Sequence, residues 1–180
     1  MKEIKIHNKS FILYITAEQI QENVLRLGRE LSTEFRGKRP VFVGILNGGA
    51  FVMGDLLKNF DGECEVSFIR LASYNDMRSS GKVKTLIDFQ EDFSNRDVII
   101  VEDIIDTGNT LEELYKKIRQ QKISSCTIVS MFLKPGVYKK DLKIDKIGLE
   151  ISDKFVVGYG SDYNGLGRNL PSLYQLKTDT

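Results

Sequence analysis

The hydrophobic positions of residues 16–36 follow a helical period. Thr16 and Gln19 have the spacing of a capping box, in which each side chain binds the backbone amide of the other residue. Apolar residues then recur at steps of three and four, at Ile20, Val24, Leu27, Leu31 and Phe35. This pattern predicts a helix from Thr16 to about Arg36 whose apolar face packs against a sheet.

Short apolar runs alternate with helical patterns along the rest of the chain. Residues 40–46 and 97–102 are typical of buried strands, because they are short and their interiors are apolar. Further strands are predicted at residues 65–71, 83–88, 125–133, 146–151 and 155–157, and further helices at 50–58 and 111–121. The alternation favours an α/β fold in which helices flank a twisted, mainly parallel sheet.

Residues 72–82 carry polar and turn-forming side chains without an apolar period. Hairpin loops usually have about two to five residues, so this segment is long enough to be a lid over a binding site. A plain connection between the neighbouring strands is the alternative. Because the chain contains no repeat, low-complexity tract or linker-like segment, residues 1–180 are expected to form a single domain.

Charge and cysteine content argue against several function classes. The 26 Lys and Arg residues nearly balance the 25 Asp and Glu residues, so no overall field favours nucleic acid or an anionic membrane. No apolar run reaches the roughly 18 residues of a membrane helix, and the N-terminal pattern does not fit a signal peptide, so a cytoplasmic protein is expected. Cys64, Cys126 and the single His7 are too scattered for a disulfide framework or a zinc site.

Acidic residues and a phosphate-binding pattern occur together in residues 98–111. The predicted strand ends in Glu102 and Asp103, and a loop with Asp106 and Gly108 leads into the next helix. In a parallel sheet such a loop lies at the ligand-binding crevice, where its amides and the helix N-terminus can cradle a phosphate. The acids can accept hydrogen bonds from sugar hydroxyls, influence a divalent cation or act as a base. A ligand with both phosphate and sugar fits both features.

The alternative interpretation is an acidic first turn that only complements the dipole of the helix. An acid pair directly after a buried run is costly without a partner, which favours the functional interpretation. The chain has neither a GxxxxGK[ST] motif nor a GxGxxG motif after a strand. P-loop NTPases and dinucleotide enzymes are therefore disfavoured.

Residues 98–111 resemble the phosphoribosyl diphosphate motif of the type I phosphoribosyltransferases, in the Glu-Asp-Ile-Ile-Asp-Thr-Gly form of the hypoxanthine (hypoxanthine-guanine) enzymes. Four further stretches resemble motifs of the same family, in the same order. They are the diphosphate loop (residues 46–49), the flexible closing loop (Ser73 and Tyr74), the purine-contact strand (133–135) and the purine-stacking hood (153–163). The resemblance implies a type I phosphoribosyltransferase fold with a small hood formed by the terminal segments.

The resemblance also implies an activity. Such a salvage enzyme transfers the 5-phosphoribosyl group from phosphoribosyl diphosphate to hypoxanthine or guanine, with Mg2+ as cofactor, and gives IMP or GMP and pyrophosphate. Its partners are these small molecules, and a homodimer or homotetramer is expected. A regulator that senses phosphoribosyl diphosphate and binds nucleic acid is one alternative, disfavoured because no basic face or added domain is visible. A catalytically silent module is another, disfavoured because Asp106, Lys134 and Asp162 occur together.

The family's functional residues correspond to particular positions of this chain. Asp106 corresponds to the general base for the purine ring nitrogen. The phosphoribosyl group would contact Glu102, Asp103, Ile105, Asp106, Thr107, Gly108, Asn109 and Thr110. The pyrophosphate would contact Leu46, Asn47, Gly48, Ser73, Tyr74 and Arg168. The purine would contact Lys134, Phe155, Val156 and Asp162, and magnesium would be held by Glu102, Asp103 and Asp162.

Some of these positions have a plainer interpretation. Lys134 is expected to donate to the purine O6, but a surface lysine after a strand is the alternative. Phe155 is expected to stack on the base, but a core phenylalanine is the alternative. Asn47 stands where some family members carry lysine or arginine, so this site has one cation fewer for the diphosphate. The resemblance also predicts a cis peptide bond between Leu46 and Asn47.

Overall fold

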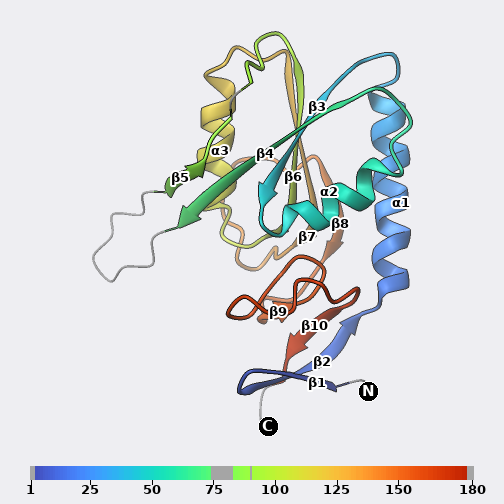
Figure 1. Cartoon of the computed structure of the whole chain (residues 1–180), viewed down its shortest axis with the longest axis vertical. Helices are drawn as coiled ribbons and strands as arrows, with labels where there is room; N and C mark the ends of the chain where they lie inside the picture. Colours follow the sequence, from blue (N-terminus) through green and yellow to red (C-terminus); the bar gives the residue numbers. More distant parts are fainter. Residues whose placement is uncertain (1–2, 74–82, 90, 178–180) are drawn as a thin grey trace.

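The body of the molecule is a twisted sheet with helices on both faces (Figure 1). The computed structural model describes residues 3–73, 83–89 and 91–177. The strands lie in the order β5-β4-β3-β6-β7-β8 and are parallel, except that β5 is antiparallel to β4. Their bounds are β3 Val41–Leu46, β4 Glu65–Ser73, β5 Val83–Ile87, β6 Asp97–Ile105, β7 Ser125–Leu133 and β8 Lys146–Glu150. The predicted α/β class is therefore confirmed.

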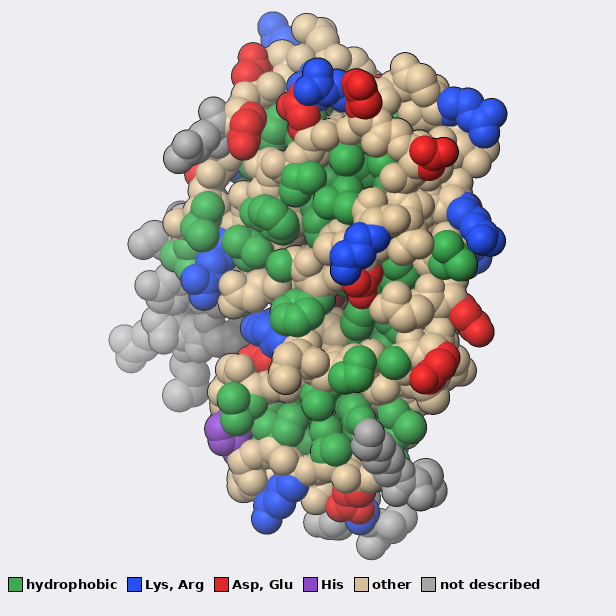
Figure 2. All heavy atoms as spheres, turned by 45° about the vertical axis from the view of Figure 1, so that its right-hand side comes forward, with side chains coloured by type: hydrophobic (Ala, Val, Ile, Leu, Met, Phe, Trp, Pro, Cys, Tyr) green, Lys and Arg blue, Asp and Glu red, His purple; other side chains and the backbone are tan. Residues whose placement is uncertain are grey.

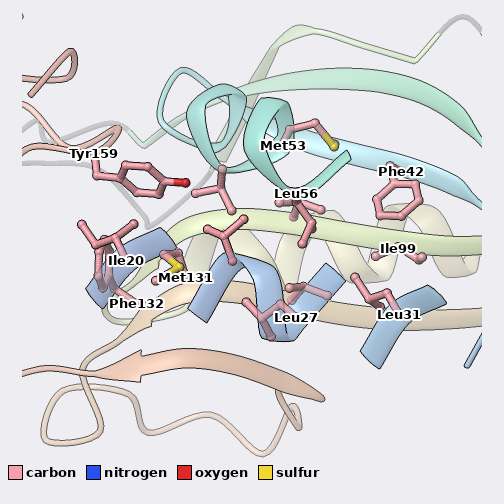
Figure 3. Close-up of a cluster of buried hydrophobic side chains, with 14 of the residues drawn as sticks. Ile20, Leu27, Leu31, Phe42, Met53, Leu56, Ile99, Met131, Phe132 and Tyr159 are labelled. Atoms are coloured by element: carbon pink, nitrogen blue, oxygen red, sulfur yellow. The ribbon is translucent and has the colours of Figure 1, made fainter. Parts of the chain in front are cut away.

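The central strands are buried on both faces, which explains why their sequences are almost wholly apolar. Along β6, Ile99 and Val101 belong to one core cluster, whereas Val98 and Ile100 belong to the other. Figure 3 shows Ile99 and Phe42 among side chains of the first cluster. Helices α1 and α2 contribute to this first cluster and α3 to the second. The helices are α1 Ala17–Glu34, α2 Gly49–Leu57 and α3 Asn109–Arg119.

A second, smaller sheet forms a hood at the end of the molecule where both termini lie (Figure 1). Its strands are antiparallel in the order β1-β2-β10-β9, and they enclose a separate apolar cluster. Hydrophobic side chains are also visible on the outside at this lower end in Figure 2. The expected hood of terminal segments is thus present. Its strands are β1 Glu3–Ile6, β2 Lys9–Ile15, β9 Val156–Val157 and β10 Leu173–Leu176.

Three of the hood strands were not predicted from the sequence. β1 and β10 have only four residues each and mix polar with apolar side chains, whereas β2 contains an apolar run, Phe11 to Ile15, that was not assigned to a strand. β1 and β2 form a local hairpin, in which Ile6 pairs with Lys9, but β10 pairs with β2 from the other end of the chain, for example Leu173 with Ile15 and Gln175 with Ile12. No local pattern in the sequence specifies such distant partners.

The helix and strand boundaries differ from the predictions in places that matter for the site. The capping box of α1 is confirmed, because Thr16 Oγ1 accepts from the Gln19 amide and Gln19 Oε1 accepts from the Thr16 amide. Strand β6 continues past Glu102 to Ile105, because its last residues pair with β7. The acid pair therefore lies within the strand rather than after it, which corrects the prediction.

The expected lid over residues 72–82 is only partly covered by the structure. Residues 72 and 73 belong to strand β4, and residues 74–82 lie outside the described residues. The lid therefore stays a prediction. Among the described residues, no helix is long and apolar enough to cross a membrane.

Candidate active site

A cavity of about 380 Å³ opens between the carboxyl ends of the central strands and the hood. Most residues that the sequence singled out line it together, although their individual roles stay predictions. They are Leu46, Asn47, Gly48, Glu102, Asp103, Ile105, Asp106, Thr107, Gly108, Asn109, Thr110, Lys134, Phe155, Val156, Asp162 and Arg168. For Ser73 and Tyr74, the prediction concerns side chains that lie outside the described part of the structure.

The loop between β6 and α3 lines the cavity where the phosphate cradle is expected. Gly108 is the N-cap of α3 and has a φ of 78°, a left-handed conformation that glycine adopts without strain. A β-carbon at this position would overlap the ring of Tyr138, so close packing also requires glycine. Because Gly108 offers no side chain to cap the helix, the first amides of α3 remain available for an anion.

The acid pair, Glu102 and Asp103, lines the cavity. The Asp103 side chain is buried and accepts a hydrogen bond of 3.2 Å from Ser161 Oγ. Burial raises the pKa of both the Glu102 and the Asp103 carboxyl. For Glu102, the charge of Asp103 raises the pKa further.

The predicted magnesium ligands do not form a ready-made cage. In the part of the chain that the structure describes, no group of three or more His, Cys, Asp or Glu side chains is placed to hold a metal. Asp162 is ion-paired with Arg168 and accepts a hydrogen bond of 2.7 Å from the Gly165 amide. Magnesium usually takes only one or two protein carboxylates and fills its octahedron with water and substrate phosphates. The carboxylates on the cavity wall therefore fit an ion that arrives with a phosphorylated substrate.

Lys134 and Asp106 form an ion pair at the wall of the cavity. The Lys134 side chain is only 7% exposed, and its Nζ donates to Asp106 Oδ2 at 3.1 Å. The Lys134 amide also donates to the Ile105 carbonyl, which ties the ends of β6 and β7 together. The interpretation of Lys134 as an ordinary surface lysine is therefore wrong. A buried ammonium needs a hydrogen-bond acceptor, and Asp106 supplies one.

The hood contributes an aromatic wall to the cavity. The Phe155 residue is 43% exposed and lines the cavity, so its interpretation as a core residue is wrong. The Tyr163 ring packs edge-on against the Phe155 ring, with 5.9 Å between the ring centroids. The Phe11 ring also packs against Phe155, with 6.4 Å between the centroids. The ring face of Phe155 is thus held in place by other rings, as a stacking surface for a planar ligand requires.

The loop between β3 and α2 closes the opposite side. The Leu46–Asn47 peptide bond is cis, as expected from the sequence resemblance. A β-carbon on Gly48 would overlap the Asp103 carboxyl group, so this loop approaches the acid pair as closely as only glycine allows. Arg168 also faces the cavity, where its guanidinium donates to the Gly160 carbonyl at 2.6 Å.

A model of the phosphoribosyl transferase domain matches residues 16–164 of this chain. The chain belongs to the phosphoribosyl transferase family. The hypoxanthine-guanine phosphoribosyltransferase of Staphylococcus aureus is 38% identical over 97% of this chain and 98% of its own length. A crystal structure of a hypoxanthine phosphoribosyltransferase from Staphylococcus aureus superimposes with a TM-score of 0.87 and 39% identity, over 92% of this chain and 90% of the other.

A bifunctional protein TilS/HprT of Listeria monocytogenes is 39% identical over 97% of this chain, but this chain spans only 27% of the length of that protein. These findings confirm the family resemblance that the sequence motifs indicated. They also agree with the observed fold, in which a phosphoribosyl transferase sheet carries its loops at the carboxyl ends of the strands.

The cavity of this phosphoribosyl transferase also contains residues that the sequence reasoning missed. Ser161 is one, and its hydroxyl contacts Asp103 although 58 positions separate the two residues in the chain. No pattern around a serine in a turn-rich segment indicates this partner. The other missed lining residues are apolar side chains at the edges of the predicted motifs, namely Ile45, Leu71, Ile104 and Leu111.

Proposed function

We propose that this chain is a hypoxanthine-guanine phosphoribosyltransferase of purine salvage. It joins a 6-oxopurine to C1 of the ribose of phosphoribosyl diphosphate, and the bond from C1 to the diphosphate breaks as pyrophosphate leaves. The products are IMP or GMP and pyrophosphate. The observation that carries this proposal is one cavity in which a phosphate cradle and an acid pair lie with a Lys–Asp pair and an exposed aromatic ring.

The phosphoribosyl side of the reaction is assigned to the cradle and the acid pair. The first amides of α3 bind the 5-phosphate, since their positive dipole end is uncapped. Glu102 and Asp103 accept hydrogen bonds from the ribose hydroxyls. Magnesium, when bound, offsets the charge of the departing diphosphate, and Glu102, Asp103 and Asp162 are the residues that would hold it. Arg168 adds a cation on the same side.

The purine side is assigned to Lys134, Asp106 and Phe155. A 6-oxopurine offers an acceptor at O6 and a donor at a neighbouring ring nitrogen, and these match the ammonium and the carboxylate of the ion pair. Lys134 then donates to O6, while Asp106 accepts the ring proton as the new bond to C1 forms. The adenine amino group would face Lys134 with a second donor, so adenine is rejected. Phe155 stacks on the base.

The expected assembly and location remain predictions. A homodimer or homotetramer is supported by exposed apolar side chains at Phe51 of α2 and Val66 and Phe68 of β4. Acidic and basic side chains are interspersed over the face drawn in Figure 2, which supports small molecules rather than nucleic acid as partners. The cytoplasmic location stays an expectation from the sequence.

A pyrophosphate-release assay tests the proposal. Purified protein is given phosphoribosyl diphosphate and, in turn, hypoxanthine, guanine, xanthine or adenine, with magnesium or with a chelator. Release is expected with hypoxanthine and guanine, and not with adenine or with the chelator. Failure to release pyrophosphate with any 6-oxopurine would contradict the proposal. Equal release with and without magnesium would contradict the assigned cofactor alone.

A further inference from the structure

Residues 158–160, which lie between strand β9 and Asp162, have an unusual backbone conformation. Gly158, Tyr159 and Gly160 have φ values of 109°, 42° and 99°, so three consecutive residues adopt left-handed conformations. Glycine does so without strain, but for a tyrosine this conformation is unfavourable and must be held by its surroundings. We call residues 158–168 the hood loop, because they connect β9 of the hood to Arg168.

The Tyr159 side chain is held at both its ring and its hydroxyl. The residue is only 4% exposed, and its ring packs edge-on against Phe132 with 6.3 Å between centroids. Its hydroxyl donates to Asp55 Oδ2 of α2 at 2.9 Å, and Figure 3 shows the hydroxyl directed toward α2. Gln21 of α1 donates to the same Asp55 oxygen at 3.0 Å, while Lys58 pairs with the other oxygen. The Asp55 carboxylate is thus also held by two neighbours other than Tyr159.

Gly160 and Ser161, which follow Tyr159, contact the diphosphate loop and the acid pair. A β-carbon on Gly160 would lie 2.7 Å from the Gly48 carbonyl oxygen, so the hood loop touches the diphosphate loop directly. Ser161 donates to Asp103 of the acid pair. Asp55 belongs to α2, and that helix begins at Gly49, the last residue of the diphosphate loop. Three consecutive residues therefore attach the hood loop to the elements assigned to the diphosphate and the ribose.

We propose that Tyr159 is a positioning residue that couples the purine half of the site to the diphosphate half through its hydrogen bond to Asp55. This inference rests on the proposed function. Tyr159 is not among the residues that line the cavity, so it acts through others. α2 is a continuous helix, so a shift of Gly48 when diphosphate binds displaces Asp55, and Tyr159 transmits the shift to the hood loop. Val156 and Asp162, which flank this segment, then close on the purine.

Steady-state kinetics of Tyr159→Phe test the coupling, because this change removes only the hydroxyl. The KM for hypoxanthine is expected to rise about three- to tenfold, the factor that one hydrogen bond of ordinary strength provides. The kcat is expected to stay within about twofold, because no reacting atom is touched. Tyr14→Phe is the matched control: the Tyr14 hydroxyl accepts from the Ser152 amide in the hood, and its loss should leave both constants unchanged.

Binding measurements separate positioning from a general loss of structure. The affinity for hypoxanthine is measured with and without magnesium pyrophosphate, a pair that cannot react. Wild-type protein is expected to bind hypoxanthine more tightly with pyrophosphate present, and Tyr159→Phe should lose most of this enhancement. Asp55→Ala should behave like Tyr159→Phe, whereas Asp55→Asn keeps an acceptor and should restore most of it. These Asp55 variants also carry the test if Tyr159→Phe fails to fold.

Three results would overturn the coupling. They are unchanged constants in both Tyr159→Phe and Asp55→Ala, a loss of kcat with an unchanged KM, or no enhancement by pyrophosphate in the wild type. Failure of the proposed function has a different signature, since wild-type protein would then release no pyrophosphate with any 6-oxopurine.

Discussion

Replacing Asp106 by asparagine separates catalysis from stability at the Lys134–Asp106 pair. The asparagine carbonyl oxygen can still accept from Lys134 Nζ, which lies 3.1 Å from Asp106 Oδ2 in the wild type. The Asp106 side chain is 51% exposed, so solvent screens much of the lost attraction. We expect the free energy of unfolding to fall by no more than about 1 kcal/mol.

The effect on catalysis should be much larger. An amide cannot accept the proton of the purine ring, and loss of a general base typically lowers turnover by about 10²–10⁴-fold. That factor equals about 2.7–5.4 kcal/mol of activation free energy. The expected loss of catalysis therefore exceeds the expected loss of stability severalfold.

Pyrophosphate release with hypoxanthine measures the first quantity, and urea unfolding measures the second. Asp88→Asn is a matched control, since Asp88 also pairs with a lysine, Lys117, but lies outside the cavity. Its turnover should equal that of the wild type. Near wild-type turnover of Asp106→Asn would refute its assignment as the base. A fall in turnover that is fully explained by a smaller fraction of folded protein would refute the separation of catalysis from stability at Asp106.

Three further predictions follow from the same cavity. Lys134→Met should lower kcat/KM for hypoxanthine and reduce the ratio of kcat/KM for hypoxanthine to kcat/KM for adenine. An unchanged ratio would contradict the role of Lys134 in O6 recognition. Gly48→Ala should destabilise the protein by about 1–3 kcal/mol in urea, because the new methyl overlaps the Asp103 carboxyl, whereas Gly54→Ala, which meets nothing within 4 Å, should not. Glu102→Gln should stabilise the ligand-free protein at neutral pH. Because the pKa of Glu102 is raised above its ordinary 4.5, the folded wild type loses stability as pH rises from that value through the raised pKa. The difference in melting temperature should therefore grow from pH 4 to 8, and a constant difference would contradict this explanation.

Local patterns determined much of the fold. The capping box of α1 needs only residues 16 and 19, and the apolar runs of β3, β6 and β7 need only the neighbouring residues in the chain. The cradle at Gly108 also forms within a few residues, where a strand turns into a helix. These features were predicted because the free energies that favour them arise between residues close in sequence.

The motif residues could be named from the sequence, but their surroundings could not. Burial of Lys134 depends on how β6 and β7 pair, and exposure of Phe155 depends on the rings of Phe11 and Tyr163 behind it. From the sequence, Lys134 stayed open between a purine contact and a surface lysine, and Phe155 between a stacking ring and a core residue. Only the assembled hood and sheet decided between them.

Contacts between distant segments were decided entirely by the tertiary structure. Tyr159 meets Asp55 across 104 positions of the chain, and the hood strand β10 pairs with β2 from the opposite terminus. The sequence by itself indicated which residues are expected to bind the phosphate, the sugar and the purine. The tertiary structure determined that they share one cavity, that the acid pair is buried and that Tyr159 joins the hood loop to α2. The physical reason is that a hydrogen bond or a strand pair between distant residues leaves no period or spacing in the chain, because only folding brings its two halves together.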